Sequence, residues 1–277
     1  MKLRIISALI MAPLAIALIL LLPTPWFIAL VAILFALGLW EWFALSGIHD
    51  TLSRGVLVAA NLAVMTAMVW SSKTAGGTSS ALFTLFTVVA LIWWCIAPLW
   101  LKFRHIGADH DSWTRVLKLF IGSIVILGAW ASMALIHGSE PNGHRWLLVA
   151  LVAVWSADSG AYFAGKFLGK HKMSPNISPN KTIEGLIGGL IAAVLIGLLF
   201  AWFAEMKREQ LPVVALSLFI AALFSVLGDL VESLLKRQAG AKDSGNVIPG
   251  HGGILDRIDG VVAAIPVFAI CKDIFRF

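Results

Sequence analysis

Apolar runs of about twenty residues recur along the whole chain, and few of them contain a charged side chain. An α-helix of about this length spans the hydrocarbon core of a bilayer. Only 13% of the 277 residues are charged and 60% are hydrophobic, whereas about 25% charged is usual for a soluble domain. We therefore predict an all-α fold, a polytopic helical bundle in a membrane.

Nine apolar segments are candidate transmembrane helices. They are Ile5–Leu22, Trp26–Leu45, Gly55–Trp70, Ala81–Leu101, Leu119–Ile136, Trp146–Phe167, Ile183–Phe203, Val213–Leu235 and Ile258–Ile274. The first follows a basic start, as in a signal peptide. It is too long for the apolar region of such a peptide, however, and no small-residue cleavage site follows it. We interpret it as a retained helix.

The charge distribution predicts an orientation and two parts. Most of the 21 Lys and Arg residues fall on one set of alternate loops, which the positive-inside rule places in the cytoplasm. The net charge of +6 is thereby explained by topology and by anionic headgroups, so no nucleic-acid partner is expected. We expect scaffold helices in 1–115 and a catalytic half in 116–277, with cytoplasmic loops 166–182 and 236–257. Glu41, a charge within the scaffold spans, is interpreted as hydrogen-bonded to a neighbour near the interface.

The stretch Ser233–Asp259 is polar although it lies between two apolar segments. Six glycines and prolines interrupt it, so its middle cannot continue a helix. A loop with both signs of charge, packed against membrane helices, suits ionic chemistry at a membrane surface. Its candidate functional residues are Lys236, Arg237, Lys242, Asp243, His251, Asp256, Arg257 and Asp259.

The helix before this loop places Asp229 and Ser233 on the same face as Lys236. A carboxylate at this depth, followed by Asp256 and Asp259, predicts a site for a hard cation such as Mg²⁺, which prefers oxygen ligands. The loop offers a single histidine and no cysteine, which argues against zinc.

Asp158 lies well inside another predicted span, one turn before Tyr162, the only tyrosine in the chain. An ionisable group at such depth is costly and commonly functional. The alternative is a polar contact between helices, which the neighbouring small residues would permit.

The loop after this span offers a second candidate site. Ser178 or Asn180 is predicted to cap the next helix, so that Lys181 and Thr182 stand in its first turn. Free backbone N–H groups there favour a phosphate. An ordinary capped helix with an interfacial lysine fits the same residues. Together, these features suit phosphoryl or nucleotidyl transfer.

The loop also carries a long pattern of fixed polar residues. Ser-x-Leu-Lys-Arg-x4-Lys-Asp-x-Gly-x2-Ile-Pro-x-His-Gly-Gly-Ile-x-Asp-Arg-Ile-Asp, over Ser233–Asp259, resembles the signature of the phosphatidate cytidylyltransferases, or CDP-diacylglycerol synthases. The resemblance continues upstream in Asp158-Ser-Gly-Ala-Tyr162 and Ser178-Pro-Asn-Lys181-Thr182. It implies that CTP and phosphatidate give CDP-diacylglycerol and pyrophosphate. It also implies a Mg²⁺-dependent homodimer of the bacterial inner membrane, in contact with membrane lipids.

The resemblance further implies roles for the candidate residues. Asp229 and Asp256 would hold the cation, with Asp259 as a weaker candidate, and potassium is allowed as a second ion. Lys236, Lys242 and Arg257 would balance phosphate charge and His251 would orient the loop or contact cytidine. Substrate-binding positions would be Ser178, Asn180, Lys181, Thr182, Ser233, Arg237, Asp243, Asp158 and Tyr162. The attacking phosphate is largely ionised at neutral pH, so no side chain is expected to act as its general base.

Other functions are compatible with part of this pattern. A CTP-dependent lipid-alcohol kinase would use the same nucleotide site but transfer the γ-phosphoryl group. A transporter of an anionic solute could use Asp158 and Asp229, although no two related halves are visible in the sequence. A purely structural subunit would not need so many charges beside its spans, and the aspartate motif of CDP-alcohol phosphotransferases is absent from the sequence.

Overall fold

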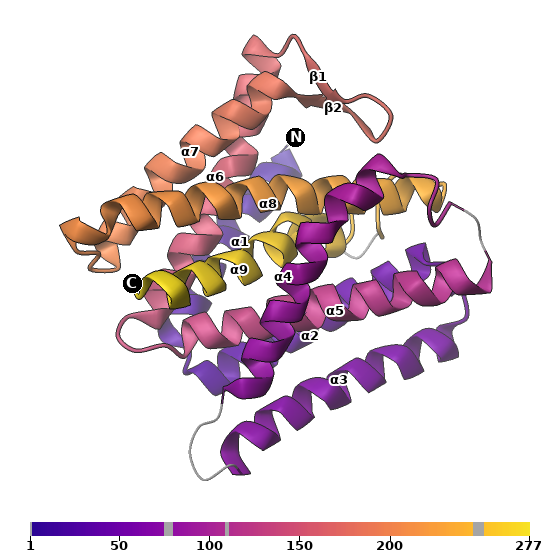
Figure 1. The fold of residues 1–277 in the computed structure, drawn as a ribbon, viewed down its shortest axis with the longest axis horizontal. Coiled ribbons are helices and arrows are strands. Elements are labelled where there is room, and N and C mark those ends of the chain that lie inside the picture. Colours follow the sequence, from indigo (N-terminus) through magenta and orange to yellow (C-terminus); the bar gives the residue numbers. More distant parts are fainter. Residues whose placement is uncertain (1, 75–79, 109–110, 246–251) are drawn as a thin grey trace.

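The computed structural model describes residues 2–74, 80–108, 111–245 and 252–277. Within these ranges the chain forms nine α-helices and one short β-hairpin (Figure 1). The helices are α1 (Lys2–Leu21), α2 (Thr24–Leu45), α3 (Thr51–Thr74), α4 (Ala81–Lys102), α5 (Ser112–His137), α6 (Gly143–Leu168), α7 (Ile183–Phe203), α8 (Leu211–Gln238) and α9 (Leu255–Phe275). Each apolar segment is helical, so the all-α prediction is confirmed.

Seven of the described helices, α2 to α8, are long and apolar enough to cross a membrane. The last helix differs because charged residues stand near both of its ends, Asp256 and Asp259 at one and Lys272 and Asp273 at the other. Its apolar middle is nevertheless buried on all sides. The bundle is therefore that of a polytopic membrane protein whose final helix packs mainly against protein.

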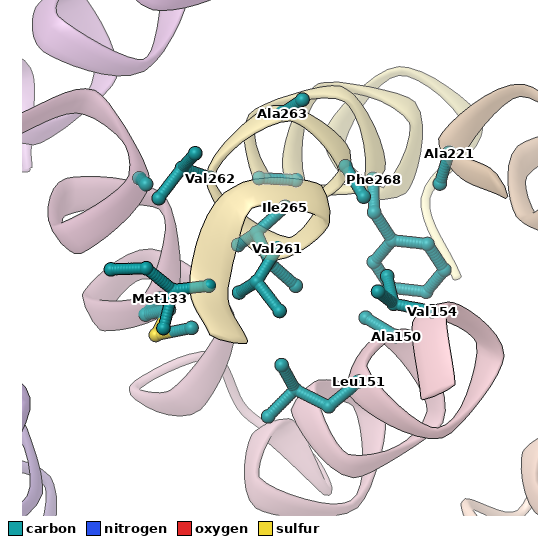
Figure 2. Close-up of a cluster of buried hydrophobic side chains, with 14 of the residues drawn as sticks. Met133, Ala150, Leu151, Val154, Ala221, Val261, Val262, Ala263, Ile265 and Phe268 are labelled. Atoms are coloured by element: carbon teal, nitrogen blue, oxygen red, sulfur yellow. The ribbon is translucent and has the colours of Figure 1, made fainter. Parts of the chain in front are cut away.

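Helix α9 lies in the middle of the hydrophobic core, between α5, α6 and α8 (Figure 2). Ile265 and Phe268 are completely buried. The indole Nε1 of Trp94, on α4, donates to the carbonyl oxygen of Val262, on α9, at 3.0 Å. This hydrogen bond is buried in the core. Helix α9, which carries Asp256 and Asp259 in its first turns, is thus held by contacts of its middle on several sides.

Helices α6 and α7 meet along a seam of small residues. A Cβ added at Gly188 would lie 2.3 Å from the Cβ of Ala164, and one at Gly160 would lie 2.6 Å from the Cβ of Ala192. Such close approach is how helices pack within a membrane. The seam fixes the position of Asp158, on α6, relative to the loop that leads into α7.

Contacts between loops group the helix ends into two sets. At one end, the Nε2 of Gln238, the last residue of α8, donates to the carbonyl oxygens of Arg104 and Ile106 at 3.0 Å each. At the other end, Arg145, early in α6, forms an ion pair with Glu205 after α7. Successive helix ends therefore alternate between the two ends of the bundle, as a chain that crosses a membrane repeatedly requires.

The loop between α6 and α7 departs from expectation. It forms the antiparallel hairpin of β1 (Lys172–Ser174) and β2 (Ser178–Thr182), which projects from the bundle (Figure 1). The predicted caps Ser178 and Asn180 are wrong, because both lie in β2. The cap is Thr182, whose Oγ1 accepts from the backbone N–H of Gly185 at 3.1 Å.

The side chain of Glu184 explains why the helix begins later. Its carboxylate accepts hydrogen bonds from the backbone N–H groups of Lys170 and His171 and contacts the His171 Nδ1 at 2.6 Å. These contacts tie the start of α7 to the end of α6. The chain between them is held as a hairpin, and Ser178 and Asn180 are drawn into extended backbone.

Candidate active site

Helices α8 and α9 touch at Gly228, and this contact assembles a cluster of carboxylates. A Cβ at Gly228 would lie 2.2 Å from the backbone oxygen of Asp259, so only glycine permits the observed approach. Asp229 and Glu232 follow on α8, and one carboxylate oxygen of each lies within 4.8 Å of one on Asp259. We call these three residues the carboxylate cluster.

The carboxylate cluster fits a hard cation. Glu232 is 2% exposed, and its Oε1 has no hydrogen-bond partner within the part of the chain that the structure describes. A buried carboxylate oxygen without a partner is costly unless a proton or a cation meets it. Three carboxylates at this spacing offer the oxygen ligands that Mg²⁺ prefers. Asp229 and Asp259 were expected at such a site, whereas Glu232 was not assigned to it.

Lys236 neutralises one side of the carboxylate cluster. Its Nζ lies 2.6 Å from the Oε2 of Glu232, one turn earlier on α8, and donates to the Oδ1 of Asp256 at 2.7 Å. All three side chains are largely buried. Since a buried charge is stable only when paired, this lysine is a fixed positive charge beside the cluster.

Asp256 is held by the loop that precedes α9. Its Oδ2 accepts from the backbone N–H groups of Ser244, at 3.0 Å, and of Gly253, at 2.8 Å, and contacts the Ser244 hydroxyl at 2.9 Å. The donors that surround Asp256 are therefore protein groups, and its pairing with Asp229 around one ion stays a prediction.

Lys181 brings the loop between α6 and α7 to the carboxylate cluster. Its Nζ forms an ion pair with the Oδ2 of Asp229, and the hydroxyl of Ser233 donates to the Oδ1 of Asp229 at 3.3 Å. Asp158 on α6 interacts electrostatically with Asp229, Lys181 and Arg257. Residues from four separate segments thus gather here, and the substrate-binding roles of Asp158, Lys181 and Ser233 stay predictions.

Most of the other predicted residues that the structure describes are exposed. Arg237 donates from Nε to the carbonyl oxygen of Ile177 at 3.4 Å, linking α8 to the hairpin. Tyr162 is 61% exposed and contacts Phe163 and Lys166. Arg237, Lys242, Asp243, Asn180 and Arg257 are also exposed, Ser178 is half-buried, and Thr182 is buried as the helix cap. His251 lies outside the described residues.

The sequence did not identify the contact that fixes the loop, which comes from Glu41 on α2. Its carboxylate accepts from the backbone N–H groups of Ile254 and Leu255, at 3.0 and 2.8 Å, and lies 2.9 Å from the Ser244 Oγ. The expectation that Glu41 is hydrogen-bonded is confirmed. The available signal was a lone charge in an apolar segment, which does not reveal partners more than 200 residues away.

The arrangement combines acidic ligands for a cation with exposed basic side chains around them. A cation held by carboxylates can bind a polyphosphate, and neighbouring Lys and Arg residues can stabilise charge that moves between phosphate oxygens. These are the elements of a phosphoryl or nucleotidyl transfer site.

Comparison with known proteins agrees with this chemistry. Residues 2–275 match a family described as the cytidylyltransferase family. The chain is 37% identical to a protein of Pseudomonas aeruginosa over 97% of this chain and 96% of the relative. A protein of Haemophilus influenzae is 36% identical over 97% of both chains, and one of Synechocystis is 33% identical over 95% and 94%. All three relatives are named phosphatidate cytidylyltransferase.

Proposed function

The chain belongs to the cytidylyltransferase family, and from this premise we propose that the carboxylate cluster is where it transfers the cytidylyl group of CTP to phosphatidate. The products are CDP-diacylglycerol and pyrophosphate. The observation that carries this function is the identity over nearly the whole chain with three relatives of that name. The geometry adds a site whose groups suit the reaction.

The reaction exchanges one phosphoanhydride bond for another. An oxygen of the phosphatidate phosphate attacks the α-phosphorus of CTP, a new P–O–P bond forms, and the bond to the β-phosphate breaks to release pyrophosphate. The attacking monoester is largely ionised at neutral pH, so no side chain needs to remove a proton from it. The protein mainly orients the two phosphates and balances their charge.

The carboxylate cluster would hold a divalent cation, and Mg²⁺ suits its oxygen ligands. When bound, such an ion neutralises phosphate oxygens and favours departure of pyrophosphate. Asp256 remains a candidate ligand, and potassium is a candidate second ion. Glu232 joins Asp229 and Asp259 because its unpartnered oxygen lies among theirs.

Two lysines have distinct roles in this proposal. Lys236 stays in place, because Glu232 and Asp256 both hold its ammonium group. Lys181 forms an ion pair with Asp229 and is also attracted by Asp158, and it could turn towards a phosphate if a cation took its place at Asp229.

Other candidate residues would meet the substrates at the rim of the site. Exposed Lys242 and Arg257 would contact phosphates, while Asp158 orients Lys181 and Arg257. We assign Arg237, Ser178 and Asn180 to the nucleotide side, since Arg237 contacts the hairpin that carries the other two. The roles of Thr182, Ser233, Asp243, Tyr162 and His251 in substrate binding remain predictions.

We propose that the site faces the cytoplasm. Seven helices can cross the membrane, and the loops on the side of the site carry most of the basic residues, as the positive-inside rule expects. A soluble nucleotide and a membrane lipid can meet at such a face. An inner-membrane homodimer remains part of the proposal and rests on the family resemblance.

The experiment that tests the function measures transfer from [α-³²P]CTP to phosphatidate in detergent–lipid micelles, with and without Mg²⁺. We expect labelled lipid and an equal amount of pyrophosphate, and loss of both when the ion is chelated. Asp229→Asn should lower the rate about 100-fold or more, as loss of a charged catalytic group commonly does. Asp273→Asn, at the opposite end of α9, is the matched control and should retain the wild-type rate.

Two outcomes would contradict the proposal. Release of CDP in the presence of a polyprenol, without transfer to phosphatidate, would identify a lipid-alcohol kinase. Wild-type transfer by Asp229→Asn would remove the carboxylate cluster from the mechanism while leaving the function in place.

A further inference from the structure

Glu41 is a buried carboxylate of the scaffold half that contacts the catalytic half. It lies near the end of α2 and is 3% exposed. Both of its oxygens are engaged: Oε1 accepts from the N–H of Ile254, and Oε2 accepts from the N–H of Leu255 and lies 2.9 Å from the hydroxyl of Ser244. It therefore receives two consecutive N–H groups at the start of α9, where a negative charge also complements the helix dipole.

The same carboxylate holds the loop between α8 and α9 from both sides. Ser244 stands before the segment 246–251, and Ile254 and Leu255 stand after it. Glycines make this possible: a Cβ at Gly245 would lie 2.4 Å from the Oε1 of Glu41, and one at Gly253 would lie 2.3 Å from its Oε2. One side chain of α2 thus brings two distant parts of the loop together.

A chain of polar contacts continues from Glu41 to the carboxylate cluster. The Ser244 hydroxyl lies 2.9 Å from Glu41 and 2.9 Å from the Oδ2 of Asp256. The other oxygen of Asp256 accepts from Lys236, which pairs with Glu232 of the cluster. A displacement at Glu41 is therefore transmitted to the charge beside the cluster through Ser244 and Asp256.

Attachment of α2 to the bundle does not depend on this contact. The indole of Trp42 donates to the carbonyl oxygen of Lys118 on α5 at 2.8 Å, and Phe35, Leu39 and Phe43 are fully buried in the core. Among the described residues, in contrast, the hydrogen-bond partners of Glu41 lie in the loop and at the start of α9.

We propose that Glu41 is a positioning residue for cytidylyl transfer: it sets the loop so that Asp256 and Lys236 stand correctly beside the carboxylate cluster. This inference rests on the proposed function. Glu41 is buried and acts through the groups that it holds. Its effect is on the orientation of groups that stabilise the transition state, for which errors of about 1 Å cost on the order of 100-fold in rate.

Glu41→Gln is the sharpest perturbation because it keeps the size of the side chain. A glutamine has one acceptor oxygen and one donor NH₂ group, so whichever way it turns, NH₂ faces one of the N–H groups of Ile254 and Leu255. We expect kcat to fall roughly 10- to 100-fold. The KM for CTP should change by less than about threefold, because the mutation removes no contact with CTP.

The experiment combines kinetics with local hydrogen exchange. Transfer to phosphatidate is measured for wild type, Glu41→Gln, Ser244→Ala and the double variant. We expect the double variant to be little slower than the slower single variant, since both act through one chain of contacts. Deuterium uptake should rise in peptides covering 252–260 and stay at wild-type levels in α5 and α6. Glu205→Gln, the same change on the exposed α7–α8 loop, should alter neither rate nor exchange at 252–260.

Several results would overturn the inference. One is a wild-type kcat in Glu41→Gln. A second is a double variant whose rate falls by the product of the two single-variant decreases. A third is increased exchange throughout the bundle, which would indicate a general loss of stability. These results bear on Glu41 only if the wild-type protein makes CDP-diacylglycerol. Absence of that activity would refute the proposed function itself, so the two failures are distinct.

Discussion

Removal of the positive charge of Lys236 should destabilise the whole protein. The Nζ of Lys236 lies 2.6 Å from Glu232 and 2.7 Å from Asp256, whose side chains are 2% and 10% exposed. Lys236→Met keeps much of the side chain's length and removes the ammonium group, with its charge and its hydrogen bond to Asp256. It leaves two carboxylates in a largely buried site without their cation.

The expected cost follows from this burial. Breaking a buried ion pair by removing one partner costs about 3–5 kcal/mol, because the remaining charge stays desolvated. For a chain of this size that corresponds to a fall in Tm of roughly 6–20 °C. Neutralising one acid should reverse part of the loss, so Glu232→Gln combined with Lys236→Met should be more stable than Lys236→Met alone.

The assay is thermal unfolding of purified protein in detergent, followed by tryptophan fluorescence, with chelator present so that no divalent ion replaces the lysine. Lys242→Met is the matched control, because Lys242 is exposed in the loop that follows α8 and its loss should alter Tm by no more than about 1–2 °C. A Tm for Lys236→Met equal to that of the wild type would refute the reasoning. So would a double variant no more stable than Lys236→Met.

Three further predictions concern separate parts of the fold. Gly228→Ala should lower both Tm and CDP-diacylglycerol synthesis, because the added methyl group overlaps a backbone oxygen of α9, at a cost of about 1–3 kcal/mol. Gly55→Ala, where a Cβ meets open space, is its control, and equal loss in both variants would contradict the argument. Thr182→Val removes the cap of α7 and should cost about 1 kcal/mol in thermal unfolding, whereas an unchanged Tm would show that the cap is dispensable. Hydrogen bonds from the side chain and backbone of Thr114 lower the pKa of Asp111, which caps α5. The stabilisation is thus present above the unfolded-state pKa of about 4 and is lost as pH falls through the lower folded-state value. The Tm deficit of Asp111→Ala at pH 7 should shrink in acid, and an undiminished deficit at pH 2 would contradict this assignment.

The helices could be predicted from the sequence because each apolar segment must satisfy its backbone hydrogen bonds within itself in a membrane. The same local reasoning failed at Ser178 and Asn180. Both are good capping residues, but the contacts of Glu184 with Lys170 and His171 hold them in a strand. A tertiary contact overrode a local preference.

The residues of the candidate site could be proposed from the sequence, but most of their pairing could not. The polar stretch Ser233–Asp259 indicated Lys236, Asp256 and Asp259 as candidates, and helical spacing placed Asp229 on the same face of α8 as Lys236. No spacing rule reveals that Lys236 bridges Glu232 to Asp256, or that Gly228 lets α9 bring Asp259 to α8. Those facts depend on how two helices cross.

The seam between α6 and α7 restricts how a lipid can reach the reaction centre. Gly160 packs against Ala192 and Gly188 packs against Ala164. At these positions the two helices are too close for a hydrocarbon tail to pass between them. If the carboxylate cluster is the site of the reaction, a diacyl substrate arriving sideways from the bilayer would have to enter elsewhere than between α6 and α7. Bulky substitutions along that other route should then slow the reaction with the lipid while leaving the affinity for the water-soluble nucleotide intact.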